Sequence, residues 1–212
     1  MTTLQYISQG ESPQEHLQHI GEACEAGVRW VQLRLKDMDP ATVLNTALKC
    51  REICDQYAAV MIVNDSVSIA KASQADGVHL GLEDINPKEA RAILGDNFII
   101  GGTANTLQDC LKHKNDGVDY IGLGPFRYTN TKKKLSPILG LEGYQKIISE
   151  LKNDIHIPIV GIGGIEKNDI SEILETGING IAVSGMLTDK EDLEERIETI
   201  KKLMVNKLEA KG

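Results

Sequence analysis

The 212-residue sequence lacks any apolar run long enough to span a bilayer, and its polar N-terminus lacks the apolar core of a secretory signal. We therefore expect no membrane insertion and a cytoplasmic protein. Basic residues are also in short supply, because 23 lysines and arginines stand against 31 aspartates and glutamates, for a formal net charge of −8. This acidic balance disfavours a broad nucleic-acid surface, so we expect no nucleic-acid partner.

Cysteine is scarce, and its spacing carries no metal or redox motif. The four residues are Cys24, Cys50, Cys54 and Cys110, without a CxxC pair or a Cys/His metal pattern. Free thiols, buried in a protein from a reducing compartment, are the simplest interpretation. The sequence also has no recognisable Ser/His/Asp or reactive-cysteine arrangement, and no GxGxxG follows its first apolar run.

What the sequence does contain is a regular alternation of short apolar runs with longer helical patterns. The apolar runs cover residues 4–8, 28–35, 59–63, 76–80, 98–102, 118–124, 157–163 and 179–185. The helical patterns cover residues 13–27, 40–58, 66–75, 86–95, 106–117, 140–152, 166–177 and 189–208. These eight even βα units predict a single-domain (β/α)₈ TIM barrel over residues 1–212, with a doubly wound open sheet as the competing architecture.

In such a barrel the active site lies at the carboxyl ends of the strands, so the residues there are the functional candidates. The stretch QLRLK places Gln32, Arg34 and Lys36 on one face if it is extended, because side chains alternate with a period of two. Their apolar neighbours must face the helices, so we expect the polar groups to point inward and toward the rim. An inward arginine and lysine need anionic partners, either rim carboxylates or a bound polyanion.

Acidic residues come after the next two apolar runs. Asn64 and Asp65 follow the third run directly, and Asp84 lies shortly after the fourth. Two carboxylates and an amide are oxygen ligands that suit Mg²⁺, which leaves its other positions to water and substrate phosphates. The structural alternative for each acid is an N-cap on the helix that follows.

Further anion-binding groups follow the remaining runs. Thr103 and Asn105 offer neutral hydrogen bonds after the fifth run, and the segment GPFRYTNTKKKLSPILG after the sixth is the longest insertion in the chain. The segments GIGGI and VSG follow the last two runs, and their glycines let backbone N–H groups approach an anion. The candidates in these last three segments are Thr129, Thr131, Lys132, Gly163, Gly164, Val183, Ser184 and Gly185. The rim thus predicts a metal-assisted diphosphate site and a mostly backbone monophosphate site.

The ordered set QLRLK, VND…ADGVHLGLED, GPFRYTNTKKK, GIGGI and AVSG resembles the thiamine-phosphate synthase family over essentially the whole chain. That resemblance implies a (β/α)₈ barrel, a transferase activity and a homodimer. The implied reaction joins 4-amino-5-hydroxymethyl-2-methylpyrimidine diphosphate to 4-methyl-5-(2-hydroxyethyl)thiazole phosphate, giving thiamine phosphate and diphosphate. It is expected to be a dissociative substitution assisted by Mg²⁺.

The resemblance also implies roles for individual residues. The pyrimidine diphosphate would be bound by Gln32, Arg34, Lys36, Asn64, Thr103 and Lys132. Arg34, Lys36 and Lys132 would stabilise the departing diphosphate. Asp65 and Asp84 would hold Mg²⁺. The thiazole phosphate site would consist of Thr129, Thr131, Gly164, Val183 and Ser184.

Three positions depart from the family pattern. Thr103 stands where the family usually has a serine and keeps a hydroxyl there, Asn105 stands where the family usually has a histidine, and Leu82 stands where it usually has a glutamine. A related thiazole tautomerase, which shares the fold and the thiazole-phosphate site, is expected to use that histidine and to lack the full diphosphate apparatus. The alternatives to the synthase are this isomerase and a non-catalytic phosphate-ligand binding protein. The presence of Asp65, Asp84 and Lys132 argues against both.

Overall fold

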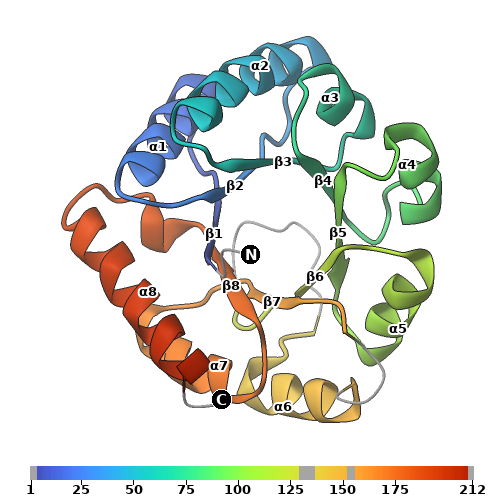
Figure 1. Ribbon diagram of the computed structural model, residues 1–212, viewed down its shortest axis with the longest axis vertical. Helices are drawn as coiled ribbons and strands as arrows, with labels where there is room; N and C mark the ends of the chain where they lie inside the picture. Colours follow the sequence, from blue (N-terminus) through green and yellow to red (C-terminus); the bar gives the residue numbers. More distant parts are fainter. Residues whose placement is uncertain (1–3, 129–136, 152–155, 210–212) are drawn as a thin grey trace.

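The apolar runs form eight parallel strands that close into a barrel, with β8 paired to β1 (Figure 1). The strands are β1 (Leu4–Ile7), β2 (Trp30–Leu33), β3 (Val60–Asn64), β4 (Gly77–Leu80), β5 (Ile99–Ala104), β6 (Tyr120–Leu123), β7 (Ile159–Ile162) and β8 (Gly180–Val183). The computed structural model describes residues 4–128, 137–151 and 156–209, the last four of these by their backbone. The predicted (β/α)₈ fold is confirmed.

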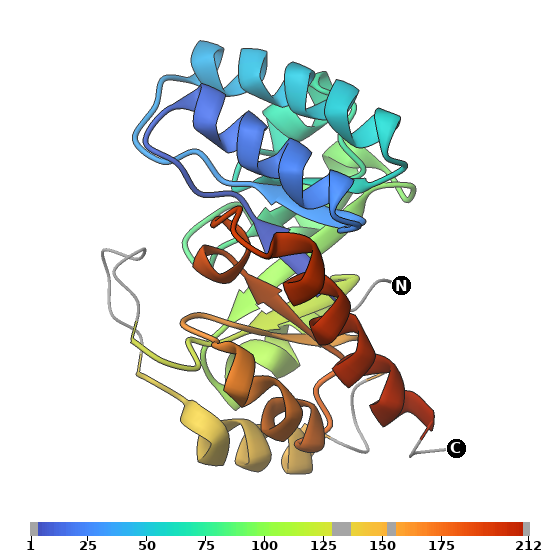
Figure 2. The same cartoon turned by 90° about the vertical axis from the view of Figure 1, so that its left-hand side faces the viewer.

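Helices surround the ring of strands, and α1 and α2 lie side by side over one part of it (Figures 1 and 2). The α-helices are α1 (Pro13–Glu25), α2 (Pro40–Gln56), α3 (Val67–Ala72), α4 (Pro87–Leu94), α5 (Leu107–Asp116), α6 (Gly140–Leu151), α7 (Ile170–Glu175) and α8 (Leu193–Glu209). Short 3₁₀ helices are η1 (Lys167–Asp169) and η2 (Gly185–Leu187). None of the described helices combines the length and apolarity needed to cross a membrane.

Local sequence explains where several helices begin. Ser12, Asp39 and Asn86 each accept a hydrogen bond from a backbone N–H of the first helical turn. A proline follows each of them at the first helical position, where its missing N–H costs nothing and its fixed φ suits the helix. The loops at the carboxyl ends of β1, β2 and β4 therefore end at helix N-termini that are stabilised by a capping side chain and a proline.

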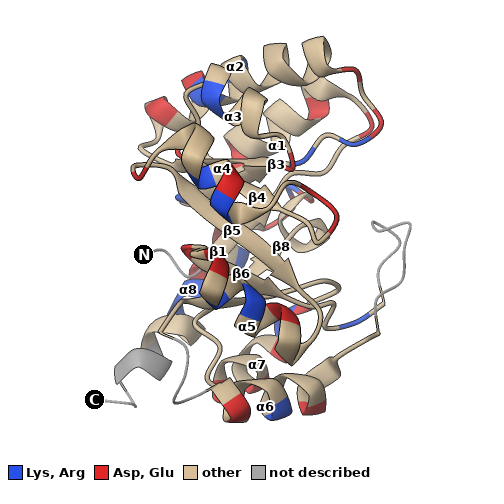
Figure 3. Cartoon of the chain, turned by 90° about the vertical axis from the view of Figure 1, so that its right-hand side faces the viewer, with Lys and Arg blue, Asp and Glu red and all other residues tan. Residues whose placement is uncertain are grey.

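The apolar side chains form two packing regions, one inside the barrel and one between the strands and the helices. Along β2, Trp30 belongs to the inner region and Val31 and Leu33 to the outer one, as the period-two alternation predicts. No strand contains a charged residue, so charges in the described part of the chain lie on helices and loops (Figure 3). The described cysteines are all buried free thiols, as predicted, and burial raises the pKa of Cys110 to about 12.

Polar groups inside the barrel connect its centre to the rim. Tyr120 Oη lies 2.9 Å from His79 Nδ1, and Gln5 Nε2 donates to the same hydroxyl at 3.5 Å. His79 Nε2 lies 2.9 Å from Thr103 Oγ1. Gly101 makes room for the tyrosine ring, because a Cβ there would lie 2.2 Å from Tyr120 Cζ. Both ring nitrogens of His79 thus have hydrogen-bond partners, as is usual for a buried polar side chain.

Candidate active site

A cavity of about 570 Å³ opens at the carboxyl ends of the strands. The predicted residues that line it are Gln32, Arg34, Lys36, Asn64, Thr103, Gly163, Gly164, Val183, Ser184 and Gly185. Asp65 and Asp84 do not line the cavity, but Asp65 forms an ion pair with Lys36, which does line it. Thr129, Thr131 and Lys132 lie outside the described residues. The structure therefore brings groups from both predicted anion sites to one cavity.

Gln32, Arg34 and Lys36 reach this cavity in different ways. β2 ends at Leu33, so strand alternation positions only Gln32, whose side chain is buried. Arg34 is half-buried and Lys36 is exposed, and both lie on the loop that follows. The prediction that strand alternation alone carries all three groups inward is therefore wrong, because the strand stops too early. All three nevertheless line the cavity.

The two cations differ in their surroundings. Lys36 Nζ lies 2.9 Å from Asp65 Oδ2, so the expected pairing with a rim acid is present. Burial lowers the pKa of Arg34, and the negative charges of Asp65 and Asp37 oppose this effect. An arginine with a lowered pKa is still charged at neutral pH. Arg34 is therefore a half-buried cation that a bound anion would stabilise.

The alternative role of Asp65 and Asp84 as helix N-caps is wrong. The cap of α3 is Ser66, whose hydroxyl accepts from Ile69 N, and the cap of α4 is Asn86. Asp65 instead adopts a positive φ of 65°, a conformation that few non-glycine residues take up. Strained backbone of this kind clusters at functional sites, which is consistent with a carboxylate held at the rim for another purpose.

Asp65 and Asp84 are close enough for their charges to interact. Burial raises the pKa of Asp84, the hydrogen bond from Gly81 N at 2.6 Å opposes this, and the charge of Asp65 raises the pKa further. A cation bound between the carboxylates would relieve that repulsion. No group of three or more acidic, histidine or cysteine side chains in the described ranges is arranged to hold a metal. A pair of carboxylates alone would suit an ion such as Mg²⁺, which takes its other ligands from water or phosphate oxygens.

The floor of the cavity presents a hydrogen-bond acceptor. Gln32 Nε2 donates to Asn64 Oδ1 at 2.7 Å, which fixes the orientation of the Gln32 amide. Gln32 Oε1 is buried and has no partner among the described residues. Since an unpaired buried acceptor is costly, this oxygen is suited to an N–H donor of a ligand. The hydroxyl of Thr103 lies on the same floor, shared with His79.

Besides Thr103 on the cavity floor, the residues that depart from the family pattern are Asn105 and Leu82, and these two have different surroundings. Asn105 is buried, and its Nδ2 donates to the carbonyl of Gly124 at the start of the β6–α6 loop. Its amide thus joins the ends of β5 and β6, and the residue does not line the cavity. Leu82 lies on the β4–α4 loop with 47% of its surface exposed.

The glycines after β7 form a turn that other residues would not fit. Gly163 and Gly164 have φ angles of 93° and 65°. A Cβ at Gly163 would lie 2.8 Å from Pro125 Cβ, and one at Gly164 would lie 2.9 Å from Arg127 Cβ. Across the cavity rim, Ser184 donates its hydroxyl to a side chain of the β1–α1 loop. The turn and Ser184 form the region in which a backbone-bound phosphate was predicted.

Sequence reasoning missed the loop after β1. Ser8 Oγ accepts from Arg34 N at 3.0 Å and lies 2.7 Å from His16 Nδ1, while Gln9 Oε1 accepts from Ser184 at 3.1 Å. This loop therefore contacts residues of both predicted anion sites. The polar segment SQG, which begins at the last residue of the first apolar run, was the available signal, by the same rule that identified the other candidates. Arg127, which also lines the cavity, was missed as well.

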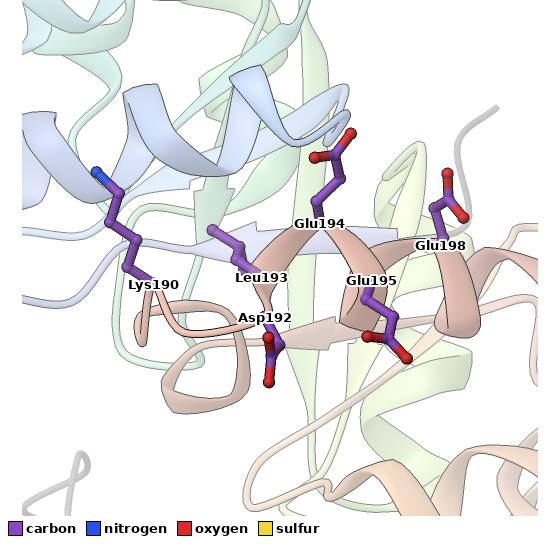
Figure 4. A pocket seen from close by; sticks show the side chains of 6 residues that line it. All are labelled: Lys190, Asp192, Leu193, Glu194, Glu195 and Glu198. Carbon is purple, nitrogen blue, oxygen red and sulfur yellow. The ribbon is translucent and has the colours of Figure 1, made fainter.

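A second hollow lies beside the start of α8 and differs in character (Figure 4). Its charged residues are Lys190, Asp192, Glu194, Glu195 and Glu198. Figure 4 shows the carboxylates pointing in different directions rather than toward a common point. An acidic helix start of this kind is expected from the helix dipole, and it offers no convergent ligand set.

Comparisons with known proteins agree along nearly the whole chain. Residues 4–187 match the family model described as "Thiamine monophosphate synthase". The thiamine-phosphate synthase of Flavobacterium psychrophilum is 50% identical over 190 residues, 89% of this chain and 92% of that protein. That of Flavobacterium johnsoniae is 46% identical over 209 residues, 98% of this chain and 95% of that protein. The solved thiamine phosphate pyrophosphorylase from Pyrococcus furiosus has a TM-score of 0.83 and 32% identity, covering 97% of this chain and 96% of that one.

Proposed function

The chain belongs to the thiamine monophosphate synthase family, and we propose the reaction it performs. The protein joins an aminopyrimidine methyl diphosphate to a thiazole phosphate, forming thiamine phosphate and releasing diphosphate. The predicted family and its transferase class are confirmed by the relatives. The observation that carries the assignment of substrates to this chain is the single cavity lined by Arg34 and Lys36 as well as by Gly164 and Ser184.

The pyrimidine substrate fits the side of the cavity built by β2 and β3. Gln32 Oε1 supplies a buried acceptor for an exocyclic amino group, since its own amide N–H is committed to Asn64. Arg34 and Lys36 lie further out along the chain, where a diphosphate attached to the ring's methylene would extend. A guanidinium can bind two phosphate oxygens at once, and an ammonium adds a point charge.

The leaving group is the centre of the chemistry. An aminopyrimidine donates electron density to its CH₂, so the C–O bond can break before the new bond forms. Negative charge then develops on the departing diphosphate, and Arg34 and Lys36 stabilise it there. Mg²⁺ held by Asp65 and Asp84 would add charge neutralisation at the same oxygens. Lys132, which the family resemblance adds to this group, lies outside the described residues.

The thiazole substrate fits the opposite side. Its phosphate would be held by backbone N–H groups of the turn at Gly163 and Gly164 and by Ser184, with Val183 beside them. Anchored by this phosphate, the ring nitrogen waits as the nucleophile for the cationic methylene. Positioning supplies much of the remaining rate enhancement, and no general base is needed. Thr129 and Thr131, which the resemblance also assigns to this phosphate, lie outside the described residues.

The alternatives have less support in the chain. A tautomerase is expected to use a histidine where this chain has Asn105, whose amide is bonded to the carbonyl of Gly124. A non-catalytic binding protein is expected to have lost the predicted metal ligands, and this chain keeps both Asp65 and Asp84.

The direct test is product formation. Purified protein is incubated with both substrates and Mg²⁺, and thiamine phosphate is oxidised to fluorescent thiochrome. Equal amounts of thiamine phosphate and diphosphate are expected, with neither formed when one substrate is omitted. Binding of the thiazole phosphate without product would favour the binding-protein alternative, and isomerisation of a thiazole tautomer would favour the isomerase.

A further inference from the structure

The glycine turn after β7 is bonded along one side to the β6–α6 loop. The carbonyl of Ile162 accepts from Phe126 N at 2.9 Å, and the carbonyl of Gly163 accepts from Arg127 N at 2.9 Å. The carbonyl of Gly164 accepts from the Arg127 guanidinium at 2.6 Å. Three consecutive carbonyl groups of the turn are therefore directed toward the same loop.

The planarity of the peptide bond fixes where the N–H groups of this turn point. In a trans peptide the N–H lies on the opposite side from the preceding C=O. Since the carbonyls of Gly163 and Gly164 face the β6–α6 loop, the N–H groups of Gly164 and Ile165 face away from it. In the barrel order β8 lies on the other side of β7 from β6, and Ser184, which follows β8, lines the cavity. Neither N–H donates to a described residue, so both are available to an anion.

Arg127 is itself held by a carboxylate from beyond the turn. Its two terminal nitrogens lie 2.8 and 2.9 Å from the two carboxylate oxygens of Asp169, a bidentate pair. Asp169 also accepts from Glu166 N at 2.8 Å, which closes the segment that follows the turn. The side chain of Asp169 is 16% exposed and that of Arg127 is 42% exposed, so the carboxylate is the shielded partner of this ion pair.

We propose that Arg127 and Asp169 are positioning residues that hold the glycine turn with its N–H groups directed at the substrate's phosphate. The proposal deepens the proposed function and rests on it for the identity of that phosphate. Arg127 acts through the turn: its terminal nitrogens already bond Asp169 and the carbonyl of Gly164, and the anion is bound by the backbone. Asp169 fixes the guanidinium, so a carboxylate promotes the binding of an anion.

This last consequence separates positioning from direct contact. If Arg127 itself bound the phosphate, Asp169→Asn would leave the longer contact to Glu166 at 3.6 Å as its only ion pair among the described residues and remove a nearby negative charge, so anion binding would stay equal or tighten. If Arg127 orients the turn, the same change loosens the turn and weakens anion binding. Asn keeps an acceptor for Glu166 N, so the local fold is retained.

The experiment measures the dissociation constants of thiazole phosphate and of inorganic phosphate by calorimetry on the full chain. We expect Asp169→Asn to weaken both ligands severalfold and Arg127→Gln to weaken them about tenfold, the scale of a lost charge-assisted hydrogen bond. Arg127→Lys, which keeps the charge but not the fork, falls between. The double variant with both changes should bind the two phosphates as weakly as Arg127→Gln alone, because both changes break the same Arg127–Asp169 contact. Affinity for the pyrimidine diphosphate stays within about twofold.

Arg91→Gln is the matched control, because it removes an arginine paired with Asp119 at 2.6 Å at the opposite end of the barrel. It is expected to change thermal stability but not the affinity for either ligand. Unchanged or tighter phosphate binding in Asp169→Asn would overturn the positioning role, as would equal weakening of both substrates. Failure of the unaltered protein to bind thiazole phosphate would overturn the proposed function instead, and the inference would then be decided on inorganic phosphate by the same criteria.

Discussion

At the scale of single residues, the cavity separates two kinds of anion recognition. Arg34 offers a half-buried charge, whereas Ser184 offers a hydroxyl beside backbone N–H groups that remain if it is removed. A charge-assisted bond contributes more than a neutral one, so the two residues should differ both in the ligand they affect and in the size of the effect.

The first prediction follows from this difference. Arg34→Ala is expected to weaken the pyrimidine diphosphate by at least about tenfold and to leave thiazole phosphate affinity nearly intact. Ser184→Ala is expected to do the reverse, by roughly threefold, since one neutral hydrogen bond is lost. Calorimetric titration of each ligand into each variant measures both effects. Equal weakening of one ligand by both changes would contradict the two-site arrangement.

Asp84 is the residue at which stability and proposed function oppose each other. Burial, together with the charge of Asp65, holds its pKa above the ordinary value for an aspartate. The folded protein then binds this proton more tightly than the unfolded chain. The stabilisation of the folded protein that comes from this proton is fully present below the pKa that Asp84 has in the unfolded chain. It is lost as pH rises through the raised pKa of Asp84 in the folded protein. Ionised Asp84 therefore disfavours the folded, metal-free protein at neutral pH.

The second prediction is that Asp84→Asn raises the melting temperature of metal-free protein at pH 7 and lowers the Mg²⁺-dependent rate. The gain in stability should shrink as pH falls through the raised pKa of Asp84, because the native carboxyl is then also neutral. The rate should drop by at least about tenfold, roughly 1.4 kcal/mol of transition-state stabilisation. Thermal unfolding in EDTA across pH measures the first effect and the thiochrome assay the second. Asp96→Asn, a matched change at an exposed aspartate, should show neither.

At the scale of elements, one arrangement recurs at the amino-terminal end of the barrel. The residue before β4, β6 and β8 exchanges hydrogen bonds with the residue near the start of the preceding strand. The three pairs are Asp76 with Met61, Asp119 with Ile100, and Asn179 with Ile159. In each pair the Asp or Asn side chain accepts a hydrogen bond from the backbone N–H of the strand residue. The backbone N–H of the same Asp or Asn donates to the carbonyl of that strand residue.

Helices α2 and α4 reinforce the two acidic members of this set. Arg51 lies 2.6 Å from Asp76, and Arg91 lies 2.6 Å from Asp119. Each arginine also donates to a backbone carbonyl just before β3 or β5, at Ala59 and Phe98 respectively. These contacts tie a helix, the start of one strand and the start of the next into one unit. They explain how pairs of βα units are fastened at the end opposite the cavity.

The third prediction tests one such unit. Asp119→Ala leaves the N–H of Ile100 without its acceptor and removes the ion pair of Arg91, which keeps only its carbonyl acceptors, so it should destabilise the protein by about 1–3 kcal/mol. Asp119→Asn keeps an acceptor for the N–H and should cost less. Urea unfolding measures the difference. The turnover number of the folded protein should not change, because these residues lie at the far end of the barrel. A loss of turnover at unchanged stability would show that the two ends are coupled.

Element types were predictable from the sequence, whereas contacts between distant elements were not. Parallel strands buried on both faces appear as short apolar runs, and the helices between them carry their own caps, such as Asn86 before Pro87. The pairing of Arg127 with Asp169 spans 42 residues and leaves no periodic signal. Lys36 was assigned to the cavity correctly but for the wrong reason, because a strand's end cannot be read from its alternation.

At the scale of the whole molecule, the contacts that stabilise the closed barrel and the residues of the candidate active site lie at opposite ends of it. The described strands carry no Lys, Arg, Asp or Glu. Ion pairs that join helices to strand starts lie at the far end, and the near end holds the cations of the cavity with Asp65 beside one of them. Motif order along the chain was enough to predict this gathering, because every βα loop of a closed parallel barrel reaches the same end. The homodimer implied by the family resemblance and the cytoplasmic location stay predictions, and sedimentation velocity on the purified chain would decide the first.

The barrel interior carries the last prediction, because its packing links the centre to the cavity floor. Tyr120 packs edge-on against Trp30 with ring centroids 4.9 Å apart, and it occupies space that only glycine at position 101 leaves open. Gly101→Ala therefore forces the ring to move and should destabilise the protein by about 1–3 kcal/mol or more. Tyr120→Leu alone should destabilise the protein because side-chain volume is lost from the barrel interior. The double variant should lose less unfolding free energy than the sum of the losses in the two single variants. Urea unfolding of both single variants and the double variant measures this coupling.

Gly21→Ala is the control, since nothing lies within 4 Å of its added Cβ in α1, and it should stabilise the protein by roughly 0.5–1 kcal/mol. Strict additivity between positions 101 and 120 would mean that the ring does not depend on the glycine.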